Sequence, residues 1–263
     1  MKERLDVLVV RRGLCTTRQR ARSEILEGHV FVDGKEERKP GRSCEETAIL
    51  ELRGEVLRYV SRGGLKLEKA LTVFKVDPKG LVCLDCGAST GGFTDCLLQN
   101  GAARVYALDV GTGQLAPSLI RDPRVVSMEN VNARALQSGD LPEAVELAVI
   151  DVSFISLRLV VPAVLRLLTD TGQIICLIKP QFEVGRQRIG KNGVVREPEL
   201  QLQVLEGLLA WFPTEGLFPA GLTYSPIRGD KGNVEFLCLL RKTSSGTAPA
   251  ARMVVDAARR ELK

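Results

Sequence analysis

Histidine, aromatic residues and long apolar runs are all scarce in this chain of 263 residues. His29 is the single histidine and no second cysteine pair accompanies Cys83 and Cys86, so no metal site is expected. No stretch of about 18 uncharged apolar residues occurs, which argues against a membrane span. The charged N-terminus lacks the apolar run of a signal peptide. Aromatic residues make up 5% of the chain, so base stacking is not expected to dominate any binding of nucleic acid.

Cysteine usage points to the redox compartment. Seven cysteines are an odd number, which argues against a complete disulfide framework and favours a reducing cytoplasm. Cys83 and Cys86 lie in an apolar stretch and are predicted to be buried thiols. A hydrophobic content of 44% is enough for a real core. The length fits one large domain, or a small domain and a medium one.

Positive charge is concentrated at the N-terminus, although the net charge is only +5. Residues 1–22 carry seven lysines and arginines against two acids, Glu3 and Asp6. A basic segment of this kind favours a nucleic acid as partner. A solvent-exposed helix face without a partner is the simpler alternative, and charge alone does not distinguish it from a nucleic-acid-binding segment.

The chain divides near residue 60. Leu5, Leu8 and Val9 have helical spacing, and a second helix is predicted from a cap at Thr16 or Thr17 to about residue 27. Strands are predicted over 30–32, before the tight turn Asp33-Gly34, and over 48–52. The first part is therefore expected to be a small α+β domain.

Residues 3–52 resemble the S4 RNA-binding domain. The resemblance rests on Arg4-Leu5-Asp6, Thr17-Arg18-x-x-Ala21, Ile25-x-x-Gly28 and Val30-x-Val32-Asp33-Gly34. It implies a surface that binds structured RNA. The phosphate contacts that it implies are Arg4, Arg18, Arg22 and Lys35.

After residue 60, short apolar runs alternate with helical stretches. Strands are predicted over 81–84, 104–108, 148–150, 174–178 and 234–240, and helices over 94–100, 157–168 and 199–211. Alternation of this kind predicts a doubly wound α/β sheet, in which ligands bind at the carboxyl ends of the strands. Four charged residues fall at such ends, namely Asp85, Asp109, Asp151 and Lys179.

A glycine-rich loop, Asp85-x-Gly87-x-x-x-Gly91-Gly92, follows the first of these strands. Glycines there let the backbone approach a ligand closely, and Asp109 at the end of the next strand suits two ribose hydroxyls. The loop matches neither the dinucleotide fingerprint nor the P-loop. A tight turn without a ligand is the alternative interpretation.

Residues 61–240 resemble the FtsJ-type methyltransferases, and the whole of residues 3–242 resembles the TlyA family. The motifs are Val60-Ser61-Arg62-Gly63-Gly64-x-Lys66-Leu67, the glycine loop, Asp151-x-Ser153-Phe154, Lys179-Pro180-Gln181-Phe182 and Gly232-Asn233-Val234-Glu235. The resemblance implies an S4-like domain over 1–58, a linker over 59–62, a Rossmann-like methyltransferase domain over 63–242 and a tail over 243–263. It also implies methyl transfer from S-adenosylmethionine to cytidine 2′-hydroxyls of 23S ribosomal RNA, with 16S RNA as a second target.

The family's functional residues can be carried over to this chain position by position. The implied catalytic set is Lys66, Asp151, Lys179 and Glu235. The cofactor residues implied, together with the loop acid, are Asp85, Gly87, Ser89, Gly91, Gly92, Phe93, Asp109 and Asn132. Further RNA contacts are expected at Arg62 and in the basic loop, at Arg186 and Arg188.

The chemistry of the four charged residues fits this reaction. A ribose hydroxyl is a very weak acid, so its proton must be removed or strongly hydrogen-bonded. We expect Lys179 to be the base or the group that orients the hydroxyl, helped by repulsion from Lys66. Asp151 and Glu235 would orient the two ammonium groups. Each residue alone would more simply be a surface salt bridge.

Two other functions stay open from the sequence. One is an RNA-binding or ribosome-assembly factor on an inactive methyltransferase fold, which the intact set of four residues argues against. The other is a membrane-lytic hemolysin, a label that the family has carried, although no strongly amphipathic apolar helix supports it.

Overall fold

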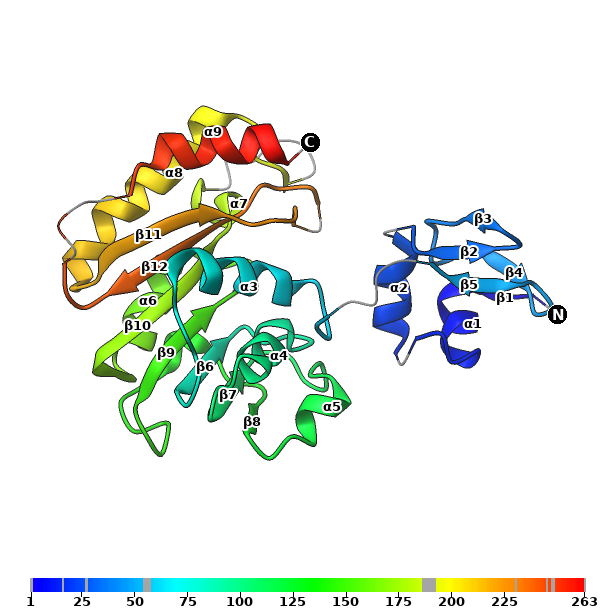
Figure 1. Ribbon diagram of the computed structural model, residues 1–263, viewed down its shortest axis with the longest axis horizontal. Helices are drawn as coiled ribbons and strands as arrows, with labels where there is room; N and C mark the ends of the chain where they lie inside the picture. Colours follow the sequence, from blue (N-terminus) through cyan, green and yellow to red (C-terminus); the bar gives the residue numbers. More distant parts are fainter. Residues whose placement is uncertain are drawn as a thin grey trace. The chain divides into compact units, whose positions relative to one another are not determined.

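The computed structural model describes residues 2–15, 17–26, 28–53, 58–185, 193–229, 231–244, 246 and 249–262. Arg186 and Arg188, expected to contact RNA, lie outside the described residues. The chain forms two compact units, Met1–Arg58 and Tyr59–Lys263 (Figure 1). Each unit is described by itself.

The first unit combines two helices with short strands. In chain order these are β1 (Lys2–Arg4), α1 (Leu5–Arg11), α2 (Arg18–Leu26), β2 (Val30–Val32), β3 (Lys35–Glu36), β4 (Ser43–Glu45) and β5 (Leu50–Leu52). Strand β1 pairs with β4, and a separate sheet has the order β3-β2-β5. The α+β content agrees with the prediction.

The apolar stripe read from the sequence forms the core of this unit. Leu5, Leu8 and Val9 are fully buried against α2, which contributes Ile25. The Asp33-Gly34 turn is confirmed, and both residues have positive φ, 50° and 77°. Strand β5 begins at Leu50, later than the predicted residue 48, because the Ala48 amide closes a turn onto Glu45.

The second unit is built on one seven-stranded sheet with the order β11-β12-β10-β9-β6-β7-β8. Its strands are β6 (Val82–Cys86), β7 (Arg104–Leu108), β8 (Val125–Met128), β9 (Val145–Ile150), β10 (Leu168–Ile178), β11 (Phe218–Tyr224) and β12 (Phe236–Arg241). Its main helices are α3 (Gly63–Phe74), α4 (Gly92–Gln99), α6 (Leu157–Leu165), α8 (Pro198–Trp211) and α9 (Ala251–Glu261). Shorter helical turns are α5 (Pro117–Ile120), η1 (Ala133–Ala135), α7 (Pro180–Glu183) and η4 (Phe212–Glu215).

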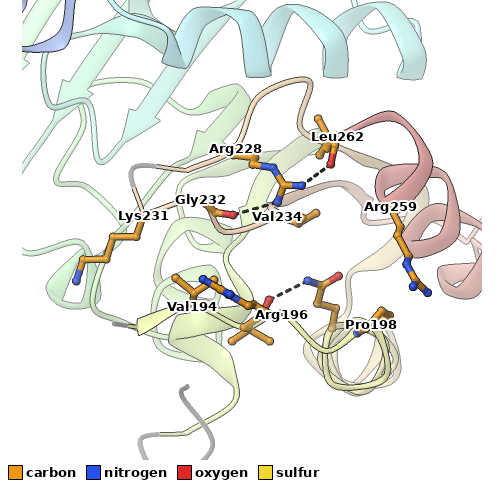
Figure 2. A pocket seen from close by; sticks show the side chains of 11 residues that line it. Val194, Arg196, Pro198, Arg228, Lys231, Gly232, Val234, Arg259 and Leu262 are labelled. Atoms are coloured by element: carbon orange, nitrogen blue, oxygen red, sulfur yellow. Dashed lines mark hydrogen bonds between the residues drawn. The ribbon is translucent and has the colours of Figure 1, made fainter. Parts of the chain in front are cut away.

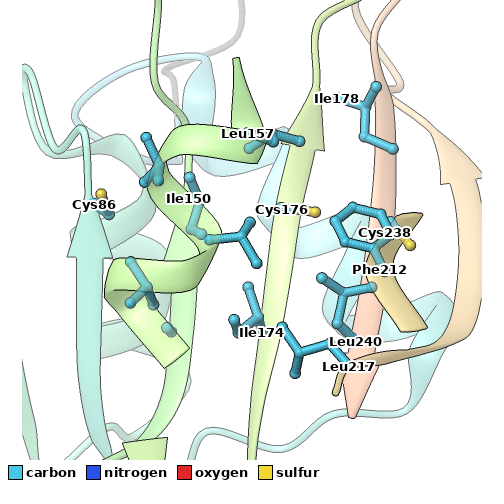
Figure 3. Close-up of a cluster of buried hydrophobic side chains, with 14 of the residues drawn as sticks. Cys86, Ile150, Leu157, Ile174, Cys176, Ile178, Phe212, Leu217, Cys238 and Leu240 are labelled. Carbon is cyan, nitrogen blue, oxygen red and sulfur yellow. The ribbon is translucent and has the colours of Figure 1, made fainter. Parts of the chain in front are cut away.

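The sheet is parallel except at β12, which runs antiparallel to both β10 and β11. The α/β prediction is thus confirmed, with one reversed strand, β12, between β10 and the edge strand β11. Successive residues of each strand face opposite sides, so Ile174 packs with α6 and α8 whereas Ile175 packs with α3 and α4. Figure 3 shows part of the first cluster, where Cys176 and Cys238 face each other on neighbouring strands. All seven cysteines are free and buried, as predicted for Cys83 and Cys86.

The segments assigned to a linker and a tail both take part in the second unit. Tyr59 is 2% exposed, and the Val60 amide donates to Asp95 Oδ2 at 2.8 Å. Helix α9 packs against α8 and β11, with Val255 buried at 1% exposure. Among the described residues, no helix is long and apolar enough to cross a bilayer, and no cluster of three His, Cys, Asp or Glu side chains suits a metal.

Candidate active site

The register of the sheet brings the predicted charged residues to one edge. Cys86 lies beside both Leu108 and Ile150 at the carboxyl ends of their strands. Ile178 of β10 is paired with Phe236, the first residue of β12. Asp109, Asp151, Lys179 and Glu235 directly follow or precede these strand ends, so all four belong to the same edge of the sheet.

Lys179 stands between the end of β10 and Pro180, the first residue of α7. Its Nζ lies 2.6 Å from Asp151 Oδ1 and donates a hydrogen bond to Ser153 Oγ at 2.9 Å. The Asp151 contact is a charge contact without hydrogen-bond geometry. The side chains of Lys179 and Asp151 are 10% and 19% exposed. Two groups therefore fix the position of this ammonium in a mostly buried setting.

Lys66 of α3 forms a second ion pair with Glu235. Its Nζ donates to Glu235 Oε2 at 2.6 Å, and the two side chains are 12% and 3% exposed. Repulsion between Lys66 and Lys179 was expected from the sequence. In the structure each of the two lysines instead has a carboxylate at 2.6 Å.

The glycine loop packs tightly against the same strand end. Gly87 has φ of +91°, and a Cβ there would lie 2.5 Å from the carbonyl oxygen of Asp151. A Cβ on Gly92 would meet Ser61 Oγ and would lie 2.9 Å from the backbone nitrogen of Gly64. Both glycines are therefore required by close approach inside the protein, before any ligand is considered. Phe93, which follows them, is buried at 3% exposure.

The outer rim of the loop is held by Asp109. Its Oδ2 accepts the Ser89 amide at 2.8 Å, and its Oδ1 accepts the Gly111 amide at 2.8 Å. Val110 beside it is 68% exposed. A carboxylate has about four lone-pair positions, and a weak third donor, Gln114 Nε2, reaches Oδ1 at 3.5 Å, so two ribose hydroxyls would displace Gln114. Asn132 caps the 3-10 turn η1, because its Oδ1 accepts the Arg134 amide at 3.2 Å.

Asp85 lies inside β6 and is fully buried. Thr94 Oγ1 donates to its Oδ2 at 2.6 Å, whereas its Oδ1 has no hydrogen-bond partner among the described residues. Burial raises the pKa of Asp85 to about 7. The structure therefore places this acid beneath the glycine loop and away from its exposed rim.

Several organising residues lie inside the recognised motifs but had no role assigned from sequence. Asn233 accepts the Val195 amide at 2.9 Å and donates to the Gly193 carbonyl at 3.0 Å. Glu183 accepts from Ser156 Oγ at 2.7 Å and from the Leu157 amide at 2.8 Å. Burial raises the pKa of Glu183. Proximity in the sequence to a predicted catalytic residue was the available signal, to Glu235 for Asn233, to Lys179 for Glu183 and to Asp151 for Ser153.

The expected RNA contacts of the first unit fall into two groups. Arg4 and Arg18 each place Nε 3.0 Å from a different oxygen of the buried Asp6 carboxylate. Hydrogen bonding from Arg4 is the main cause that lowers the pKa of Asp6. Arg22 and Lys35 are exposed. Arg62 is half-buried and belongs to the second unit.

Comparison with known proteins agrees with both units. Residues 59–242 match the FtsJ-like methyltransferase family and residues 3–49 match the S4 domain. YqxC of Bacillus subtilis is 48% identical over 93% of this chain and 88% of its own length. The Mycobacterium tuberculosis 16S/23S rRNA (cytidine-2′-O)-methyltransferase TlyA is 42% identical over 99% of this chain and 97% of its own. A solved Streptococcus thermophilus structure, whose description carries the word hemolysin, has a TM-score of 0.81 at 47% identity and covers 99% of this chain and 96% of its own.

Proposed function

This chain belongs to the TlyA family, in which an S4 domain precedes an FtsJ-like methyltransferase, and we propose that it methylates cytidine 2′-hydroxyls in ribosomal RNA. One observation carries the proposal beyond the family match. Two buried ion pairs, Lys66–Glu235 and Lys179–Asp151, meet at the edge of the sheet beside the glycine loop. The relative from Mycobacterium tuberculosis is named for both 16S and 23S RNA, and we infer the same two substrates here.

The loop fits S-adenosylmethionine, the methyl donor of this family. Asp109 would hold the ribose diol of the cofactor, and the exposed Ser89 and Val110 would border it. When bound, S-adenosylmethionine supplies an electrophilic methyl group on a sulfonium. Asp85 and Asn132 support the loop and the neighbouring turn through the contacts described above.

Lys179 is assigned the role of orienting the ribose hydroxyl. Its ammonium is fixed between Asp151 and Ser153, so a remaining N–H can donate to the 2′-oxygen of the RNA. Asp151 Oδ1 is buried against Lys179 Nζ, and the rest of this partly exposed carboxylate is the basic group available to take the hydroxyl proton. Lys66, held by Glu235, positions the ribose from the α3 side.

The test is transfer of tritium from labelled S-adenosylmethionine to isolated ribosomal subunits, compared between wild type and Lys179→Ala. We expect the rate to fall by roughly a hundred- to ten-thousand-fold, with cofactor affinity unchanged. Lys79→Ala, an exposed lysine at the opposite edge of the sheet, should transfer at the wild-type rate. Transfer by Lys179→Ala at the wild-type rate would refute the site, and no transfer by wild type to either subunit would refute the function.

A further inference from the structure

A hollow lies near helices α8 and α9, on a part of the second unit that the proposed reaction does not use. It has a volume of about 570 Å³. Its walls come from the segment before α8, the loop before β12 and the end of α9 (Figure 2). The lining residues that matter here are Arg196, Arg228, Lys231, Val234 and Arg259. Neither the catalytic set nor the cofactor loop contributes to it.

The charge of this hollow is entirely positive. Four cations line it and no acid does. Arg196, Lys231 and Arg259 form no ion pair or side-chain hydrogen bond within the described chain. Arg228 is bonded to backbone oxygens only, those of Gly232 at 3.1 Å and Leu262. Four cations gathered without counterions favour an anionic ligand.

Two acids of the flanking helices are engaged elsewhere, and a third, the exposed Glu197 at the N-cap of α8, does not line the hollow. Glu199 of α8 binds Arg252 through both carboxylate oxygens, at 2.5 and 2.8 Å, and Glu261 accepts the Tyr224 hydroxyl. The N-terminus of α8 also opens on the hollow through Pro198, and helix N-termini favour anions. Figure 2 shows Lys231 and Arg259 on opposite sides of the view, with Arg228 and Arg196 between them.

The hollow is joined to the catalytic edge by one short segment. Val234 lines it, whereas the next residue, Glu235, binds Lys66 on the other side. Asn233 ties this segment to Gly193 and Val195 through two hydrogen bonds of 3.0 and 2.9 Å. A strand of RNA whose ribose reaches Lys66 and Lys179 therefore has this hollow as an immediate neighbour.

We propose that the hollow binds backbone phosphates of the RNA strand that flanks the methylated ribose. The proposal rests on the proposed function, because it takes RNA as the substrate. One guanidinium group can donate two parallel hydrogen bonds to two oxygens of the same phosphate. Such contacts fix register without reading sequence, and this suits an enzyme that must present one ribose. The site would hold the substrate near the chemistry, separately from the S4 unit.

The test compares two triple variants of the full chain that remove the same charge. Arg196→Gln/Lys231→Gln/Arg259→Gln empties the hollow of its three unpaired cations. Lys75→Gln/Lys79→Gln/Arg241→Gln removes three exposed cations away from the catalytic edge. Binding to unmethylated large ribosomal subunits is measured from 50 to 300 mM salt, with cofactor affinity and thermal unfolding as checks on folding.

We expect the hollow variant to lose affinity at least tenfold at low salt. Its plot of log affinity against log salt should be shallower by about two to three, since each lost phosphate contact reduces the slope by nearly one. KM for the subunits should rise while kcat at saturation is retained. The control variant should keep the wild-type slope to within about one. Because binding is measured without turnover, this result stands apart from whether methyl transfer occurs.

Equal affinity and equal slope for the two triple variants would overturn the proposal. A calorimetric titration with inorganic pyrophosphate distinguishes the phosphates of RNA from those of a free phosphorylated ligand. Binding of pyrophosphate that the hollow variant loses, together with an unchanged RNA slope, would assign the hollow to a free phosphorylated ligand and would equally overturn it.

Discussion

The buried pair of Lys66 and Glu235 allows its structural and functional contributions to be separated. Glu235 is 3% exposed and its carboxylate is neutralised by Lys66 Nζ at 2.6 Å. Lys66→Met removes the ammonium and leaves a buried, uncompensated carboxylate. Breaking a buried pair from one side costs roughly 3 to 5 kcal/mol. For a unit of this size that lowers the midpoint of thermal unfolding by roughly 6 to 20 °C.

Replacing both partners should restore stability but not activity. Lys66→Met/Glu235→Met places two apolar side chains of similar length where the charges met, and such replacements are often neutral for stability. Calorimetric unfolding and methyl transfer to ribosomal subunits are measured on the two single variants and the double. We expect the double variant to unfold near the wild-type temperature and to remain inactive.

An exposed pair supplies the control. Arg252 and Glu199 are 50% and 68% exposed, and exposed pairs contribute little to stability because water screens the two charges. Arg252→Met should therefore change the unfolding temperature by only a few degrees and leave transfer intact. A double variant of Lys66 and Glu235 that transfers methyl groups at the wild-type rate would show that the pair is structural, and the argument for its catalytic role would fail.

Four further results are expected. Asp109→Ala should weaken S-adenosylmethionine binding at least tenfold by calorimetry because two ribose hydrogen bonds are lost, and unchanged affinity would remove Asp109 from the cofactor site. The pKa of Asp85 is raised from 3.8 to about 7, so between these pH values the folded state keeps a proton that the unfolded state releases. The free energy of unfolding therefore falls as pH rises from about 4 to 7, by up to about 4 kcal/mol. Asp85→Asn should flatten that part of the curve of unfolding temperature against pH, and an unaltered curve would contradict this. If Lys179 orients the hydroxyl as an ammonium, kcat should stay level from pH 7 to 9, whereas a tenfold rise per pH unit would identify Lys179 as the base. A fragment of residues 59–263 should bind S-adenosylmethionine like the full chain but lose most affinity for ribosomal RNA, and equal affinity with an equal salt slope would argue against RNA binding by the S4 unit.

The sequence predicted the positions of the strand ends better than the contacts made there. Apolar runs that end in Asp109, Asp151 and Lys179 indicated three strands of one sheet, and parallel strands bring such ends to the same side of the sheet. The pairing of the two lysines with the two carboxylates depends on how α3 and the start of β12 orient their side chains. Lys66 and Glu235 are 169 residues apart, and no local pattern specifies that meeting.

Other parts of the fold are set by tertiary packing. Strand β10 begins at Leu168, although a helix was predicted over 157–168 and a strand only from residue 174, because pairing with β9 extends that far. The reversal of β12 depends on how the chain returns through β11. Helix α9 was predicted as a helix, but its packing on α8 and β11 depends on a surface that only the folded sheet provides.

The central claim is that the methyl group is delivered to a ribose oxygen of cytidine. The most direct measurement is mass spectrometry of nucleosides from ribosomal RNA after reaction with the wild-type chain and S-adenosylmethionine. The structure predicts 2′-O-methylcytidine with wild type and none with Lys179→Ala. A methyl group on the cytosine base, or 2′-O-methylcytidine formed equally by the Lys179→Ala chain, would contradict the account.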